Sequence, residues 1–238
     1  MLTLLESIRT HPVEGTLSKL MSVTGDFFGA TAKAYKPGSI LCRQGEEEDK
    51  VFFVKSGWGL FYRDLPNGER QILDTPLRGD LVGFRSISMQ NPSPWFASLA
   101  SITELSVIEI PKKDLLTAMQ ADGDRSVQIA CALARQNTIL AEHLMNAGRR
   151  DAPTKLAHFL LELEERLSHV GLASLGRYEC PLTQHELADI LGMTTVHVNR
   201  TLRELRESDL ISFKSGHVDV IDRKRLVKLA GFDKEYLS

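Results

Sequence analysis

The side chains best suited to specific chemistry lie in the stretch LGMTTVHVNRTLREL, residues 191–205. Val198, Leu202 and Leu205 recur at the spacing of one helical face, so we expect that face to be buried. The opposite face lacks the Glu and Lys mixture of an ordinary solvated helix and carries Thr195, Val196, Asn199, Arg200 and Arg203. Arginine can pair with guanine, asparagine with adenine, and valine can pack on a thymine methyl group. These residue types therefore suit the readout of DNA bases in a major groove.

The residues around this helix predict a helix-turn-helix. Thr183 and Glu186 have the spacing of a capping box, which opens a helix that Gly192 closes. Thr194 or Thr195 then caps the helix described above. The rival interpretation is a surface helix that packs on another protein. The complete order of caps, turn and second helix favours DNA.

A hairpin, ISFKSGHVDVI, follows and would form the wing of a winged helix. Polar and cationic side chains near the second helix and in the wing can contact phosphates. We expect backbone contacts from Thr183, Thr194, His197, Arg203, Arg206, Lys214 and His217. We expect base contacts from Thr195, Val196, Asn199 and Arg200.

The composition is that of a globular protein, with 42% apolar and 25% charged residues among 238. The net charge is −2, so any DNA affinity must come from a local patch. The three cysteines, Cys42, Cys131 and Cys180, are far apart and odd in number, which predicts a reducing, cytoplasmic setting. The N-terminus resembles neither a signal peptide nor an anchor, and no apolar run is long enough for a membrane span.

Two further regions precede the helix-turn-helix. Residues 36–111 alternate short β-rich runs with turn residues, which predicts a small antiparallel barrel or sandwich. The expected strands are 51–55, 59–63, 71–74, 96–100 and 105–110. Asn67 and Gly68 form a hairpin signal in which both residues can take a positive φ. Trp58 and Trp95 are expected to fill the barrel.

The second region is helical. A short helix from Lys112 precedes a long helix over about 125–145, and another helix spans 154–168 with Leu156, Phe159, Leu160 and Leu163 facing inward. The long helix carries residues at coiled-coil spacing: Ala130, Leu133, Asn137, Leu140 and Leu144. This stripe either packs on the chain's own barrel or forms a dimer seam in which Asn137 pairs with the same residue of the second subunit. Its narrowness favours the dimer seam.

From about residue 30 to its end, the chain resembles the CRP/FNR superfamily of bacterial transcription regulators. The motifs that carry the resemblance are Pro37-Gly38, Gln44-Gly45-Glu46, Val51-Phe52-Phe53-Val54, Gly57, Asn67-Gly68, Gly79-Asp80 and the helix-turn-helix from Thr183 to Arg206. The stretches GDLVGF, PSPWFAS and IEIP are nearer to the fumarate-nitrate regulator branch than to the cyclic-AMP receptor.

The resemblance implies an α+β fold with a double-stranded β-roll sensor, a long dimerisation helix and a C-terminal winged helix-turn-helix. The corresponding division is 1–110 (sensor with N-terminal helices), 111–148 (short and long helices) and 149–238 (DNA-binding domain). The implied function is a homodimeric regulator, not an enzyme, on a palindromic operator, with RNA polymerase as a partner if it activates. The alternative is a cyclic-nucleotide-binding-like signalling module that acts through a protein partner.

The resemblance also places a candidate effector pocket in the β-roll. Its expected members are Gly79, Asp80, Gly83, Phe84, Arg85, Trp95 and Phe96. Phe84 stands where the cyclic-AMP receptor has a ribose-binding Glu, and Phe96-Ala97 replace its phosphate-binding pair. Cyclic AMP is therefore not the expected effector, although Arg85 could serve as a substitute phosphate ligand rather than as a surface ion-pair residue.

Other cofactor chemistry has little support in the sequence. No cysteine precedes Cys42, so the four-cysteine iron–sulfur site of the oxygen-sensing branch is not expected. Haem stays open, with His11 and Cys42 as candidate axial ligands. Five histidines lack zinc-site spacing and are expected to be solvated or on helix surfaces: His158, His169, His185, His197 and His217. No common catalytic motif is present.

Overall fold

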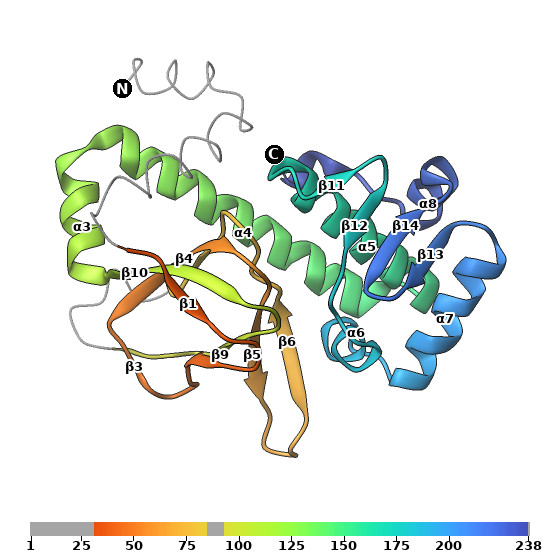
Figure 1. The fold of residues 1–238 in the computed structure, drawn as a ribbon, viewed down its shortest axis with the longest axis horizontal. Helices are drawn as coiled ribbons and strands as arrows, with labels where there is room; N and C mark the ends of the chain where they lie inside the picture. The colour runs from red at the N-terminus through yellow and green to blue at the C-terminus, as the bar shows by residue number, and fades with distance from the viewer. Residues whose placement is uncertain (1–30, 85–92, 238) are drawn as a thin grey trace.

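Figure 1 shows a computed structural model of the chain, which describes residues 31–84 and 93–237. A β-domain lies at one end, and a smaller domain of helices and short strands lies at the other. The long helix α4 (Gly123–Arg149) runs beside both. The expected N-terminal helices, His11 and Arg85 lie outside the described residues.

The β-domain consists of two four-stranded antiparallel sheets and a two-stranded one, which confirms the expected antiparallel β-structure. The sheet orders are β1-β10-β4-β7, β2-β9-β5-β6 and β3-β8. The strands are β1 (Lys33–Tyr35), β2 (Ile40–Cys42), β3 (Glu47–Glu48), β4 (Lys50–Ser56), β5 (Gly59–Asp64), β6 (Arg70–Asp74), β7 (Leu81–Val82), β8 (Ser93–Pro94), β9 (Ser98–Ser101) and β10 (Leu105–Pro111). Phe52 and Val54 of the first sheet pack with Leu99 of the second in one buried cluster, with Trp95 beside them. Trp58 is also buried, but in the cluster that includes Ile139 and Leu156 and not inside the barrel as expected.

The hairpin between β5 and β6 differs from the prediction in one detail. Gly68 has a positive φ of 85°, but Asn67 does not share that conformation. The Asn67 side-chain oxygen instead accepts a hydrogen bond from the Glu69 backbone N–H at 3.1 Å. A side-chain hydrogen bond of this kind stabilises the turn without a left-handed conformation at Asn67 itself.

Helix α3 (Lys112–Ala121) leads into α4, which is two residues longer at its start and four longer at its end than predicted. The Asp122 carboxylate caps α4 by accepting hydrogen bonds from the backbone N–H groups of Asp124 and Arg125. The buried residues of α4 are Ile129, Arg135, Ile139 and Asn146. The stripe predicted for a dimer seam lies mainly on the other side, where Leu140 is 49% exposed and Leu144 is 75% exposed.

The C-terminal domain packs its helices around α5 (Ala152–His169), whose Leu156, Phe159, Leu160 and Leu163 are all buried as predicted. Its sheet has the order β11-β12-β14-β13. The remaining elements are β11 (Ala173–Ser174), β12 (Arg177–Glu179), α6 (Gln184–Leu191), α7 (Thr195–Glu207), β13 (Ile211–Lys214), β14 (His217–Val220), α8 (Arg223–Ala230) and the 3₁₀ helix η1 (Lys234–Leu237). Strands β11 and β12 were not predicted, and they extend the two-stranded wing to four strands.

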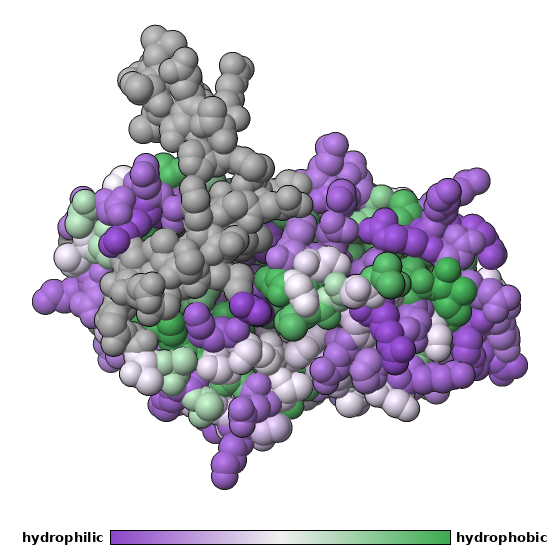
Figure 2. All heavy atoms as spheres, turned by 45° about the horizontal axis from the view of Figure 1, so that its top comes forward, coloured by the Kyte–Doolittle hydropathy of each residue, from purple (hydrophilic) through white to green (hydrophobic). Residues whose placement is uncertain are grey.

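The face in Figure 2 is largely hydrophilic, with separate hydrophobic groups between the charged ones. Among the helices that the structure describes, none is both long and apolar enough to cross a membrane.

Candidate nucleic-acid interface and sensor cavity

Three local devices delimit the helix-turn-helix: a capping box at the start of α6, a glycine at its end and a threonine cap at the start of α7. The Thr183 hydroxyl accepts from the Glu186 backbone N–H at 3.2 Å, while the Glu186 carboxylate accepts from the Thr183 N–H at 2.7 Å. Gly192 ends α6 in the left-handed conformation, with φ of 60°. Thr194, rather than Thr195, caps α7 by accepting from the His197 N–H at 3.2 Å. Gly192 and Thr194 thus define the end of α6 and the start of α7, and the capping box defines the start of α6.

Helix α7 has two chemically distinct faces. Val198, Thr201 and Leu205 are buried against the rest of the domain, and Leu202 is half-buried. The residues predicted to read bases, Thr195, Val196, Asn199 and Arg200, are all exposed. The Val196 side chain is 77% exposed, so its methyl groups are available to a partner. In Figure 1, α7 lies at the outer edge of the molecule, on the side away from the β-domain.

The arginines of α7 form only exposed ion pairs. The Arg200 Nε lies 3.6 Å from Glu204 Oε1, and the Arg203 Nε lies 2.7 Å from Glu207 Oε1. The hydrogen bond and the charge of Glu207 raise the pKa of Arg203. Exposed pairs of this kind contribute little to stability, so both guanidinium groups can exchange a carboxylate for a phosphate or a base.

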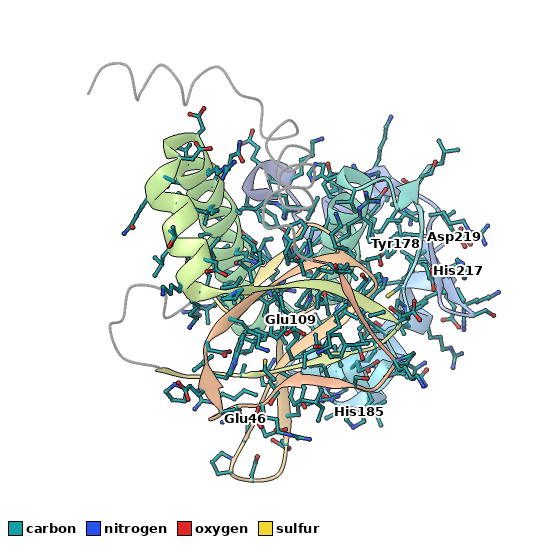
Figure 3. All side chains as sticks on the ribbon, turned by 60° about the vertical axis from the view of Figure 1, so that its left-hand side comes forward. Glu46, Glu109, Tyr178, His185, His217 and Asp219 are labelled. Atoms are coloured by element: carbon teal, nitrogen blue, oxygen red, sulfur yellow. The ribbon has the colours of Figure 1, made fainter. Side chains whose placement is uncertain are left out.

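Two further predicted phosphate contacts flank the turn of the wing. Lys214 ends β13, His217 begins β14, and the two residues are paired across the hairpin. Both are exposed, and Figure 3 shows His217 near the edge of the molecule with Asp219. Arg206 is likewise exposed on α7.

Thr183, the predicted phosphate contact at the start of α6, already has a partner. Its hydroxyl donates to the Glu186 carboxylate at 2.8 Å, so a phosphate would have to compete with that contact.

A cavity of about 520 Å³ lies between the β-domain and α4. Its lining residues are Phe61, Leu73, Asp74, Pro76, Leu81, Val82, Gly83, Phe84, Trp95, Phe96, Leu133, Gln136, Asn137 and Leu140. Four members of the predicted pocket are therefore in the lining: Gly83, Phe84, Trp95 and Phe96. A side chain at Gly83 would lie 2.4 Å from the Trp95 ring, so the close approach of this ring requires glycine.

Gly79 and Asp80, which were also expected in the pocket, are not among the described lining residues of this cavity. Asp80 is 7% exposed, and its carboxylate accepts hydrogen bonds from the Leu77 backbone N–H and from Arg166 Nη2, both at 2.8 Å. Arg135 is a second cation, 3.7 Å away. Asp80 thus neutralises buried arginines instead of facing a ligand.

Comparison with known proteins agrees with both halves of this architecture. A Crp-like helix-turn-helix domain matches residues 154–229, and a cyclic nucleotide-binding domain matches residues 32–122. The fumarate and nitrate reduction regulatory protein of Vibrio cholerae is 28% identical over 85% of this chain and 80% of its own length. The nitrogen fixation regulation protein FixK of Rhizobium meliloti is 28% identical over 82% of this chain and 85% of its own. The structure of FixK2 from Bradyrhizobium japonicum superposes with a TM-score of 0.76 at 25% identity, covering 86% of this chain and 98% of that one.

The chain belongs to the CRP/FNR superfamily. Its members are DNA-binding transcription regulators and not enzymes, and DNA binding and dimer formation are features of the family. The fold prediction of a sensor β-domain, a long helix and a C-terminal helix-turn-helix is confirmed.

The described part of the cavity lining in this CRP/FNR chain is mainly apolar. Among its described lining residues there is no Lys or Arg to pair with a cyclic phosphate. The Asp74 carboxylate faces a cation elsewhere, since Arg166 Nη1 donates to it at 3.0 Å. The same lining offers no His, Cys or Met as an axial ligand for haem. Cys42, the other haem-ligand candidate, is buried among core residues of the β-domain and does not line the cavity.

Sequence reasoning missed a buried ion cluster between the two domains. Arg166 of α5 is 3% exposed and contacts Asp74 at 3.0 Å, Asp80 at 2.8 Å and Glu162 at 3.4 Å. His143 of α4 lies 2.9 Å from the same Glu162 carboxylate. Burial alone would lower the pKa of His143, but the adjacent carboxylate outweighs it and raises that pKa to about 9. The only sequence signal was the i, i+4 spacing of Glu162 and Arg166, which is also typical of a surface pair.

His158 corrects the expectation that the histidines are solvated. It is 1% exposed, and its ring stacks on Tyr236 with centroids 5.9 Å apart. Burial, and then the charge of Arg150, lower its pKa to about 4. Within residues 31–84 and 93–237, no three His, Cys, Asp or Glu side chains are grouped to hold a metal ion.

Proposed function

We propose that this CRP/FNR regulator acts as a homodimer that places two copies of α7 in successive major grooves of a palindromic operator. The observation that carries the proposal is the two-sided character of α7. Its apolar side is anchored in the domain core, while the opposite side exposes residues that can hydrogen-bond to bases or pack on them. A helix fits the major groove, and its first turns reach the base edges.

In this proposal the residues divide by role. Arg200 pairs with a guanine, Asn199 with an adenine, and Val196 packs on a thymine methyl, with Thr195 beside them. The phosphate contacts come from Thr183, Thr194, His197, Arg203, Arg206, Lys214 and His217. The phosphate contacts set register and affinity, and the base contacts set sequence preference.

The proposed dimer forms along the exposed stripe of α4: Ala130, Leu133, Asn137, Leu140 and Leu144. Three of these residues, Leu133, Asn137 and Leu140, also line the cavity. A molecule in the cavity would therefore contact the seam directly. This arrangement supports gating of DNA binding by an uncharged, mainly apolar effector.

The proposal includes the setting in which the regulator works. The three-part division at residues 110 and 148 is retained, with sensor, dimer helix and DNA-binding domain in that order. The regulator acts in the cytoplasm, where the bacterial chromosome is. If it activates transcription, RNA polymerase is a further partner.

Selection from a random duplex library tests this function directly. The full chain should enrich a two-fold symmetric motif whose half-sites are centred about one helical turn, roughly 34 Å, apart. Affinity for the selected duplex should fall steeply with salt, because each neutralised phosphate releases a counterion. Failure to enrich any symmetric motif, together with salt-independent binding, would instead favour a signalling module that acts through a protein partner.

A further inference from the structure

Strand β6 of the sensor domain contacts the helix-turn-helix through a group of hydrogen bonds. Arg70 donates to the same Asp189 carboxylate oxygen through Nε at 3.0 Å and through Nη2 at 2.8 Å. The neighbouring Gln71 amide donates to the Asp189 backbone oxygen at 2.6 Å. We call Arg70, Gln71 and Asp189 the interdomain latch.

The latch is less exposed and has more contacts than an ordinary surface ion pair. The Arg70 side chain is 31% exposed and that of Asp189 is 13% exposed. The Arg70 guanidinium also lies over the Tyr62 ring, 5.3 Å from its centroid. This second contact restricts the orientations that the guanidinium can take. His185 is a second neighbour of the Asp189 carboxylate, at 3.4 Å. Two donors on one carboxylate and a third on the adjacent carbonyl fix both position and rotation.

Asp189 is placed where it can control the reading helix. It lies in the last turn of α6, three residues before Gly192, and α7 begins at Thr195. The β5–β6 hairpin and the helix-turn-helix border a groove that is lined by Arg70 and Gln71 on one side and by Thr194 and His197 on the other. The latch therefore holds the turn that sets the direction of α7, and it does so from the side, leaving the exposed face of α7 open.

The same strand reaches the cavity. Phe61 pairs with Asp74, whereas Tyr62 pairs with Ile72, so Leu73 is an extra residue in β6. A bulge of this kind redirects side chains, and both Leu73 and Asp74 line the cavity. One end of β6 thus contacts the cavity while the other end contacts α6.

We propose that Arg70, Gln71 and Asp189 are positioning residues for DNA recognition: they hold each α7 at the orientation that a two-half-site operator requires. The inference rests on the proposed function. A dimer binds both half-sites only if its two reading helices have the right separation and direction, so loosening the latch reduces the fraction of competent dimers. Binding to a single half-site has no such requirement.

The test measures affinity for the selected full-site duplex and for a duplex that carries one half-site. Arg70→Glu should weaken full-site binding by about tenfold while half-site affinity stays within about twofold. Arg70→Met, which keeps an apolar stem on Tyr62, should give the same pattern with a smaller effect. The double variant Arg70→Asp with Asp189→Arg should restore most of the full-site to half-site ratio. Arg43→Glu makes the same charge change at an exposed position of the sensor and should leave the ratio unchanged.

Three results would overturn the inference. They are an unchanged ratio in both Arg70 variants, a raised ratio, and no recovery in the double variant. A raised ratio would mean that the latch restrains DNA binding instead of promoting it. These results presuppose that the wild-type chain selects a symmetric site, so they are distinct from failure of the proposed function itself.

Discussion

At the scale of single residues, the exposed face of α7 makes Arg200 and Arg203 separable in function. Both are exposed arginines with an acidic neighbour one turn away. Arg200 lies one residue after Asn199, near the middle of the helix, whereas Arg203 lies one turn closer to its C-terminal end. Base edges are read from the first turns of such a helix, and phosphates are reached from its flanks.

Arg200→Ala should weaken operator binding by about 1–3 kcal/mol per half-site and remove the preference for one G·C pair. The physical reason is loss of two hydrogen bonds to guanine, with no change in the fold because the side chain is exposed. Selection with the variant measures the preference. A G·C preference that survives unchanged at every position would show that another residue reads the guanine.

Arg203→Ala should weaken all duplex sequences alike and leave base preference intact. Loss of one phosphate contact reduces the number of released counterions, so the slope of log affinity against log salt should become shallower by about one per half-site. Titrations at several salt concentrations measure that slope. A change of sequence preference with an unaltered slope would move Arg203 into the base-reading group.

His143 predicts a dependence of stability on alkaline pH. Its folded-state pKa of about 9 lies above the ordinary histidine pKa of 6.5, because the Glu162 charge outweighs burial. Its stabilising contribution is therefore complete below about pH 6.5 and is lost as the pH rises through about 9. We expect urea unfolding to show a loss on the order of 1–3 kcal/mol over that range. The His143→Gln variant should lose less unfolding free energy as the pH rises. An equal loss of unfolding free energy in this variant would mean that other groups cause the effect.

At the scale of elements, α4 carries the exposed stripe that we assign to the dimer. Leu133 is half-buried and lines the cavity, so its substitution would disturb the sensor as well as the seam. Leu140 also lines the cavity but is 49% exposed, and Leu144 is 75% exposed and lies outside the described lining, so this pair provides a cleaner test. Burying unpaired charges in an apolar interface costs several kcal/mol, while the same charges are tolerated on a solvated surface.

The double variant Leu140→Glu with Leu144→Glu should therefore dissociate the dimer without unfolding the chain. Sedimentation velocity measures the oligomeric state, and circular dichroism checks the fold. Leu175→Glu is the matched control, because Leu175 is fully exposed at the β11–β12 turn. If the double variant stays dimeric, the seam lies elsewhere.

Elements with local signals could be predicted from the sequence, and those that depend on tertiary contacts could not. The capping box at Thr183 and the two-faced pattern of α7 each depend on a few residues that are close in sequence, and both are confirmed. Strands β11 and β12 have only two and three residues, too few for a periodic pattern. Asp80 was assigned to the pocket because its motif lies there in sequence. Its true partner, Arg166, is 86 residues away, and no spacing rule connects them.

At the scale of the whole molecule, the sensor and the DNA-binding domain share polar contacts in addition to the chain connection between α4 and α5. Arg166 connects α5 to Asp74 and Asp80 of the β-domain, and the interdomain latch connects β6 to α6. Both contacts involve residues 70–80, the segment that also forms one wall of the cavity. A change in the cavity can therefore reach the reading helix through the β-domain as well as through α4.

The same wall determines which ligands the molecule can accept. A buried cyclic phosphate needs a paired cation, and its absence costs several kcal/mol. The described lining is mainly apolar, and its carboxylate, Asp74, would repel a phosphate. We therefore expect calorimetry to detect no micromolar binding of cyclic AMP, and cyclic AMP to leave affinity for the selected operator unchanged. Micromolar binding that disappears in Arg85→Ala would contradict this and identify Arg85 as the replacement cation. Micromolar binding that persists in that variant would mean that the nucleotide binds outside the cavity described above.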